Sequence, residues 1–351
     1  MDKLSGEVKT ILSDQQGMAL LITVMTVSLL IAVTVMFHRK SWHSYLVANN
    51  YKIDTRLKAM GESGINIGLA FLQQDLNKNS HDSLFDDWAA LRKEDLGAFF
   101  GTGHLELEIV DLSGRLQINS LVQTTSQGQG NEGNEGNQGD NNTENEIRDI
   151  LVRLLLSPMF VTEEESEAFQ IVDALVDWID EDERESDDGA ESSYYQALEN
   201  PYGCRNGPVL YIEELLLVRG ITPLLLFGEG EKKGLVDYIT VHGDDGKINI
   251  NTADSLLIKS LDPLIGDELV ERLISFRKDE ENREQLESPV WYSSIGSWPG
   301  DIVLNENLLT TQSRYFLIQS TAVSDLHFRR VTAVVNRVDK KTVKVLSKKV
   351  K

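Results

Sequence analysis

An uncharged run near the amino terminus constrains this chain most. Residues 18–37 read MALLITVMTVSLLIAVTVMF and carry no charged side chain. At about 1.5 Å per residue, a helix of this length spans the roughly 30 Å hydrocarbon core of a bilayer. A secretory signal would combine a shorter apolar run with a small-residue cleavage site directly after it, and neither is present. The run therefore predicts a membrane-spanning helix, and a plain single-pass anchor is the simplest interpretation.

Composition argues against two classes of function. The formal net charge is −22, whereas a nucleic-acid interface needs clustered Lys and Arg. The single cysteine, Cys204, excludes an internal disulfide and a cysteine-based zinc site. The sequence contains no H-E-x-x-H, G-x-S-x-G or P-loop motif, and Cys204 has no histidine near it in sequence. We therefore expect neither a nucleic-acid partner nor an enzyme.

The helical pattern continues well beyond the apolar run. No proline occurs before residue 77, and apolar or small residues recur at alternating spacings of three and four from Ile53 to Phe71. A helix from Met18 to Leu76 would be about 90 Å long. The polar residues 77–83 are expected to end it.

Alternation of polar and apolar residues predicts three hairpins, at 104–119, at 236–251 and at 315–338. The sequences GRLQINS (114–120) and GKININT (246–252) match position by position, which indicates a weak internal repeat. In each copy the final hydroxyl residue, Ser120 or Thr252, is expected to cap the segment that follows. Residues 339–351 are lysine-rich and are expected to form a frayed basic tail.

Between the first two hairpins the pattern is mostly helical. Residues 123–146 are nearly devoid of apolar side chains and are expected to form a disordered loop. A helix should follow, and a capping box of Thr162 and Glu165 should open the next one. The residues 256–277 read as two helices with a break at Pro263. The expected buried positions of the first two helices are Ile147, Ile150, Leu151, Leu154 and Leu155, then Phe169, Val172, Leu175, Val176 and Ile179.

Acidic residues are concentrated from Glu163 to Glu191, where fourteen acids accompany one base, Arg184. One interpretation is a solvated acidic face. The other is a calcium site, because calcium takes six to eight oxygen ligands at flexible geometry. Trp178 and Ile179 lie within the run and should hold it against a core, where uncompensated carboxylates repel one another. A divalent cation would relieve that repulsion.

The junction Gln15-Gln16-Gly17-Met18 resembles the prepilin cleavage site of type IV pilins and type II secretion pseudopilins. The resemblance implies that a prepilin peptidase removes residues 1–17 by cutting between Gly17 and Met18, and that Met18 is then N-methylated. In that family a glutamate usually occupies the fifth mature position, which is Ile22 here. An unpaired buried carboxylate is costly, so a subunit with no neighbour ahead of it would be expected to lack this glutamate.

Further motifs resemble the K-type minor pseudopilin of type II secretion, the GspK family. They are DWIDED, DGAESSYY, NPYGCRNGP, EELLLVRGI and GKININ, which follow one another at family spacing. The resemblance implies an α+β, pilin-like fold, in which a long N-terminal helix packs on an antiparallel sheet, with an inserted α-helical domain that binds calcium. The implied ligands are Asp177, Asp180, Asp182, Asp187, Asp188 and Glu191.

The implied organisation has six parts. These are a leader (1–17), a transmembrane half-helix (18–37), a first pilin-like part (38–122), an inserted domain (123–235) with its acidic loop (177–191), a second pilin-like part (236–338) with a helical hairpin (254–278), and the basic tail (339–351).

The implied function is that of a minor pseudopilin at the pseudopilus tip, which helps to initiate fibre assembly and to export folded periplasmic proteins across the outer membrane. The implied partners are the I- and J-type minor pseudopilins, the major pseudopilin and the prepilin peptidase. The chain would cross the bacterial inner membrane once, with its bulk in the periplasm. The alternative is a membrane-anchored periplasmic binding or DNA-uptake protein, because residues 248–266 resemble the opening of a helix-hairpin-helix module. Its acidic surroundings argue against DNA binding.

Overall fold

The computed structural model describes residues 15–91, 94–95, 103–122, 138–160, 164–230, 232–324, 327–339 and 342–351. The chain divides into two compact units after Ala59, and each is considered by itself. The first unit consists of the beginning of helix α2 (Gln15–Lys78), whose side chains are exposed from Gly17 to Lys52. By length and composition this helix is able to cross a membrane. The expected long helix from Met18 to Leu76 is thus confirmed.

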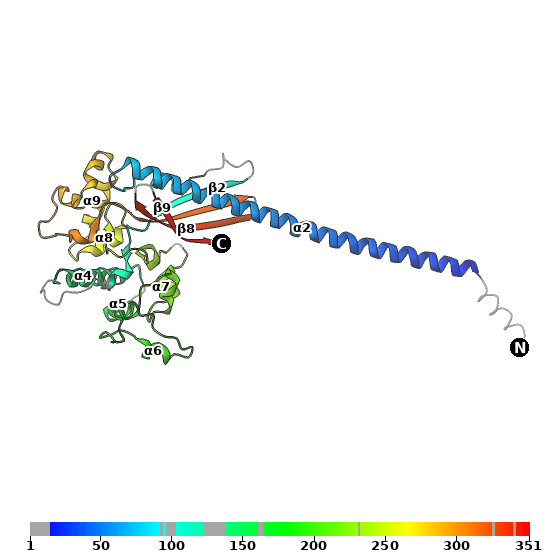
Figure 1. Ribbon diagram of the computed structural model, residues 1–351, viewed down its shortest axis with the longest axis horizontal. Helices are drawn as coiled ribbons and strands as arrows, with labels where there is room; N and C mark the ends of the chain where they lie inside the picture. The colour runs from blue at the N-terminus through cyan, green and yellow to red at the C-terminus, as the bar shows by residue number, and fades with distance from the viewer. Residues whose placement is uncertain are drawn as a thin grey trace, which may run out of the picture. The chain divides into compact units, whose positions relative to one another are not determined.

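A five-stranded antiparallel sheet forms half of the second unit (Figure 1). Its order is β1 (Glu94–Asp95), β2 (His104–Asp111), β7 (Tyr315–Ser324), β8 (His327–Asp339) and β9 (Thr342–Val350). The last part of α2 packs on one face of this sheet, and Leu72 meets Ile109, Phe316 and Val335 in a common core. The α+β fold with a helix on an antiparallel sheet is therefore confirmed.

Small residues allow α2 to approach the sheet closely. A Cβ atom on Gly68 would lie 2.8 Å from Cγ2 of Ile318, and one on Gly64 would overlap the hydroxyl of Ser320. The short helix α3 (Asp87–Ala90) closes this core through Trp88, whose ring meets that of Phe316 edge-on at 5.2 Å.

The strand pairing corrects two of the three expected hairpins. The hairpin of β7 and β8 is confirmed, but β2 pairs with β7 and not with the segment that follows it. That segment, β3 (Leu116–Gln117), pairs in parallel with β4 (Ile239–Thr240). In the same way, β5 (Ile248–Asn249) pairs in parallel with β6 (Leu309–Thr310). The hairpins expected at 104–119 and 236–251 are thus wrong, because each short strand finds its partner far along the chain.

The expected caps at Ser120 and Thr252 are also wrong. Ser120 lies inside a 3-10 helix, η2 (Ile118–Leu121). The next helix in the second copy, α8 (Ser255–Leu261), is capped by Asp254, whose carboxylate accepts a hydrogen bond of 3.0 Å from the N–H of Leu256. The expectation of a frayed C-terminal tail is wrong as well, because residues 342–350 form β9 and pair with β8.

The other half of the second unit is helical. Its elements are α4 (Gln138–Leu155), α5 (Glu165–Ile179), α6 (Ser192–Gln196), η3 (Ile212–Leu217), α7 (Pro223–Phe227), η4 (Leu235–Asp237), α8, α9 (Asp267–Lys278), η5 (Glu280–Glu287), η6 (Trp291–Ser294) and η7 (Glu306–Leu308). One continuous core joins α4 and α5 to α8 and α9, so the expected boundary at residue 235 falls inside a single hydrophobic cluster.

Three expectations for this half need correction. Residues 138–146 belong to α4 and are not a loop, while 123–137 lie outside the described residues. Helix α5 begins at Glu165, and Glu164, the residue at its N-cap position, makes no side-chain capping hydrogen bond. The expected capping box is therefore wrong. Thr162 itself lies outside the described residues. Phe169 is 41% exposed, whereas the other predicted core positions of α4 and α5 are buried.

Candidate functional site

Three of the predicted calcium ligands converge at the end of α5. Asp177 is in the last turn of that helix, Asp180 directly follows it, and Glu191 immediately precedes α6. One carboxylate oxygen from each lies within 4.8 Å of the other two. Asp177 and Glu191 are almost fully buried, at 0% and 2% exposure. The chain between them therefore loops out and returns so that the third acid lies beside the first two.

Aromatic packing and backbone hydrogen bonds fix this loop. The ring of Trp178 meets that of Tyr195 edge-on at 5.1 Å, which anchors the helix end beside α6. The N–H of Ser186 donates to both oxygens of Asp177, at 3.1 and 3.2 Å. Gly189 lies so close to the Asp177 carboxylate that a Cβ atom there would overlap it. A glycine is consequently required where the loop passes back over the acid.

The protein around the three acids satisfies them only in part. Both carboxylate oxygens of Glu191 and Oδ1 of Asp180 are buried. In the part of the chain that the structure describes, none of these three atoms accepts a hydrogen bond from an N–H or O–H group. Burial raises the pKa of Glu191 to about 7, and the charges of Asp180 and Asp177 add to the rise. Burial and the charges of Asp182 and Asp177 raise the pKa of Asp180 to about 6. The site thus presents unsatisfied oxygen acceptors of like charge.

The other three predicted ligands lie at the surface. Asp182, Asp187 and Asp188 are exposed. Oδ1 of Asp182 accepts a hydrogen bond of 2.7 Å from the N–H of Arg184, so it serves a local turn. Cys204 lies beside the cluster, with Sγ 3.4 Å from the carbonyl oxygen of Asp177. Burial raises the pKa of its thiol to about 12, which keeps it protonated and poorly suited to nucleophilic attack.

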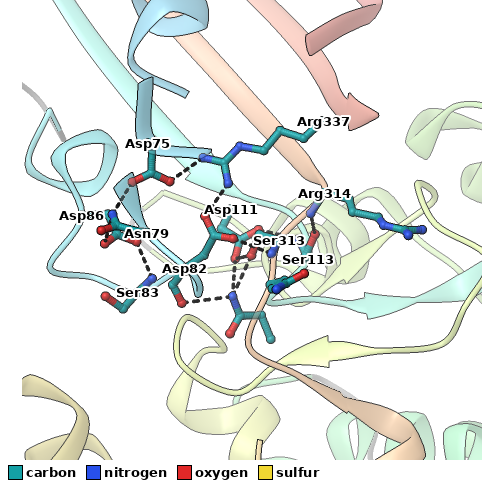
Figure 2. A network of polar contacts seen from close by, with 12 residues as sticks. Asp75, Asn79, Asp82, Ser83, Asp86, Asp111, Ser113, Ser313, Arg314 and Arg337 are labelled. Atoms are coloured by element: carbon teal, nitrogen blue, oxygen red, sulfur yellow. Dashed lines mark hydrogen bonds and ion pairs between the residues drawn. The ribbon is translucent and has the colours of Figure 1, made fainter. Parts of the chain in front are cut away.

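A second group of acids, not predicted from the sequence, surrounds Arg337 (Figure 2). The guanidinium of Arg337, in β8, donates to Asp75 at 2.8 Å and to Asp82. Asn79 donates to Asp75 at 2.6 Å and to Asp86 at 3.0 Å, which connects the end of α2 to the segment before α3. Asp75, Asp82 and Asp86 are close enough to hold a metal ion, but the arginine already binds two of them. We read this group as a structural ion-pair network.

The network extends into the segments that border the helical half. Asp111, at the end of β2, accepts hydrogen bonds from the hydroxyls of Ser313 and Thr252 through the same carboxylate oxygen. Ser313 also donates its N–H to Asp82 at 2.7 Å. Burial raises the pKa of Asp111, and it raises that of Asp82 to about 7. Asp75, Asp82 and Asp86 lie close together in the sequence, but Arg337 is 262 positions from Asp75 and Ser313 is 231 positions from Asp82, so no local signal indicated the network.

The helical hairpin of α8 and α9 does not present its cations as a phosphate site would need. Lys259 is paired with Asp267 at 2.6 Å. Arg277 is buried, and its guanidinium donates to the carbonyl oxygen of Ile250 at 3.0 Å. Both groups stabilise the fold in these positions, which favours a packing role for the hairpin.

The predicted processing site lies in the first unit. Gly17 and Met18 are in the exposed beginning of α2. Among the described residues, no atom outside the helix's own backbone and the two neighbours of Gly17 lies within 4 Å of the position that a Cβ atom would take on Gly17. Ile22 is 60% exposed on the same helix. The cleavage between Gly17 and Met18 and the methylation of Met18 remain predictions.

Comparison with known proteins finds similarity to one family over part of the chain. Residues 114–226, which include the acidic loop, match the family model described as type II secretion system (T2SS), protein K. A type II secretion system protein K from Aeromonas hydrophila is 31% identical over 203 residues. Over these residues the chain is similar to type II secretion protein K.

The two matching proteins cover different shares of this chain. The Aeromonas protein K matches over 54% of this chain and 56% of its own length. A chain in the solved crystal structure of the GspK-GspI-GspJ complex, from the enterotoxigenic Escherichia coli type 2 secretion system, matches 87% of this chain and 99% of its own. Its TM-score is 0.60 at 18% identity, so this likeness supports the fold.

Proposed function

We propose that this chain is a member of the type II secretion protein K family, a minor pseudopilin that caps the tip of the type II secretion pseudopilus. There it takes part in initiating fibre assembly and in exporting folded periplasmic proteins across the outer membrane. The observation that carries the proposal is the match of residues 114–226 to protein K. The long helix α2 and the large helical half are in keeping with a subunit at a fibre end, because a bulky domain is hard to accommodate inside a helical fibre.

The proposed surroundings follow from the same family. Residues 18–37 would anchor the chain in the bacterial inner membrane, with its bulk in the periplasm. Its direct partners would be the I- and J-type minor pseudopilins, because the related solved structure is a complex of GspK with GspI and GspJ. The major pseudopilin and the prepilin peptidase would be further partners.

We also propose that Asp177, Asp180 and Glu191 hold a calcium ion. Their oxygens are hard ligands, and three of them are buried without a hydrogen-bond donor. Calcium would supply the positive charge that these acids lack. The chain's own contribution is to hold Asp177 between the N–H of Ser186 and the backbone of Gly189, so that its carboxylate faces Glu191. Backbone carbonyls, water or the nearby surface acids would complete the coordination.

A substitution at Ile22 tests the position in the fibre. At the tip, Ile22→Glu would introduce a carboxylate without a neighbouring amino terminus to pair with, at a cost of several kcal/mol if it stays charged. We expect weaker secretion, measured as the fraction of an exported protein in the medium. Ile22→Gln is the matched control, since it has the same size without the charge and should weaken secretion less. A shaft subunit would retain or gain function with Ile22→Glu, and that result would contradict the tip assignment.

A further inference from the structure

A groove of about 490 Å³ lies between the sheet and the loop before η3. Leu317 of β7 and Val334 of β8 line it from the sheet. Both alternate along their strands with residues that pack toward α2, such as Phe316 and Val335, so the groove lies on the opposite face of the sheet. Tyr211, on the loop, lines it from the other side and is 57% exposed. The groove is therefore open and largely apolar.

Strand β9 forms one side of this groove and one edge of the sheet. Leu346, Ser347 and Lys349 line the groove from β9. In the described part of the chain, β9 pairs with β8 alone, so the backbone groups along its other side are available. An unpaired strand edge beside an apolar groove is the arrangement that binds an extended peptide as an added strand.

The edge is also strongly basic in an acidic protein. Residues 342–351, which comprise β9 and Lys351, contain four lysines and no acid, in a chain with a formal net charge of −22. Lys349 and Lys351 line the groove. Lys349 already binds a carboxylate there, that of Glu213, at 2.6 Å. The chemistry of this rim thus suits an acidic ligand.

We propose that this groove and the free edge of β9 bind an acidic, extended segment of a partner protein. The segment would pair its backbone with β9, so that every second side chain faces the groove. Apolar side chains at these positions would lie beside Leu346, and acidic ones would meet Lys349 and Lys351. Peptide is favoured over nucleic acid or lipid headgroups because the apolar groove and the backbone edge match a strand, whereas phosphates need cations alone. This inference goes beyond the tip assignment and does not depend on the metal site.

Binding of a defined peptide tests the proposal. The probe is a short, fluorescently labelled peptide of the repeat Glu-Ser-Val-Ser, which presents both Glu and Val on one face of a strand. It is titrated with the detergent-solubilised full chain and followed by anisotropy. We expect saturable binding that weakens as salt is raised, because exposed charges are screened. A peptide of the repeat Lys-Ser-Val-Ser should not bind. Equal binding of the two peptides would overturn the proposal.

Two neighbouring lysines provide a matched pair of variants. Lys348 and Lys349 are 41% and 44% exposed, and each binds one glutamate, Glu62 at 2.9 Å and Glu213 at 2.6 Å. They point to opposite faces of β9, and only Lys349 lines the groove. Lys349→Glu should weaken peptide binding about fivefold, the size expected for one exposed ion pair, while Lys348→Glu should leave it unchanged. Equal losses in both would overturn the proposal.

A third variant tests the groove without changing charge. Ser347→Trp should fill the groove and reduce binding of the acidic peptide, and unchanged binding would argue against a peptide in the groove. Displacement of the peptide by phosphatidylglycerol vesicles or by duplex DNA, undiminished in Ser347→Trp, would assign the basic edge to phosphates instead and overturn the proposal.

Discussion

The guanidinium of Arg337 in β8 donates a hydrogen bond of 2.8 Å to the carboxylate of Asp75 in α2. The two residues are 262 positions apart in the sequence. The same group also binds Asp82, and it lies 4.3 Å from the centre of the Phe316 ring. One side chain thus connects the end of the long helix, the segment after it and the sheet.

Removing this arginine should destabilise the second unit strongly. In Arg337→Ala, the buried carboxylates of Asp75 and Asp82 lose the cation between them. Loss of one partner from a buried ion pair costs about 3–5 kcal/mol. We expect that decrease in the free energy of unfolding, measured by urea titration of the full chain in detergent. Arg330→Ala is the control on the same strand; Arg330 is exposed, so its loss should cost less than about 1 kcal/mol. Similar costs for both variants would contradict a dominant role for Arg337.

The same network should make stability depend on pH. Burial raises the pKa of Asp82 from 3.8 to about 7, although Arg337 opposes the rise. The folded state then binds a proton that the unfolded chain releases. This contribution to stability is complete below the unfolded pKa of 3.8 and is lost as the pH rises through about 7. Stability should therefore decrease from about pH 5 to about pH 8, measured by urea unfolding with a calcium chelator present.

Two variants separate Asp82 from other titrating groups. Asp82→Asn should reduce the pH dependence of the free energy of unfolding over this range, whatever its effect on stability at one pH. Asp87→Asn should preserve it, because Asp87 is exposed and pairs with Lys78 at the surface. An unchanged slope in Asp82→Asn would show that other groups produce the effect.

The elements that were predictable from the sequence are those with a long local pattern. The helix α2 and the hairpin of β7 and β8 each bury one face over many residues, so their periodicity is visible. The pairs of β3 with β4 and of β5 with β6 involve strands of two residues, and their partners lie far along the chain. Such short strands carry no periodicity, and the nearby turn residues favoured hairpins instead. Tertiary pairing therefore decided what local sequence could not.

The candidate site shows the same limit. The acidic run indicated either a calcium site or a solvated acidic face, because charge density is visible in sequence, and the family resemblance implied six ligands within it. Which acids converge depends on the path of the loop, and that path follows from the packing of Trp178 on Tyr195 and from the fit of Gly189 against Asp177. Asp180 and Glu191 meet there, whereas Asp182 serves a turn. For Arg337 there was no signal, because its acids lie far from it in the sequence.

Calcium should stabilise the protein through the acids that converge. At a calcium concentration a hundred times the dissociation constant, the gain would be about 2.7 kcal/mol. We expect a higher Tm of the full chain in detergent with calcium than with chelator. Glu191→Gln should remove this difference. Asp188→Asn, which changes an exposed acid of the same loop, should retain at least part of it. Coincident melting curves of the wild-type protein with and without calcium would favour the interpretation of the run as a solvated acidic face.

Processing at Gly17 provides the last prediction. In the described part of the chain, the space beside Gly17 is open, since no atom beyond its neighbours and the helix's own backbone lies within 4 Å of the position for a Cβ atom. Gly17→Leu should therefore leave the fold intact, and a failure of cleavage would report on recognition by the peptidase. We expect the variant to retain residues 1–17, while the wild type begins at a methylated Met18, as determined by mass spectrometry of membrane extracts. Thr23→Leu, on the same exposed helix, should be processed normally. A wild-type chain that keeps Met1 in cells with active type II secretion would refute the cleavage.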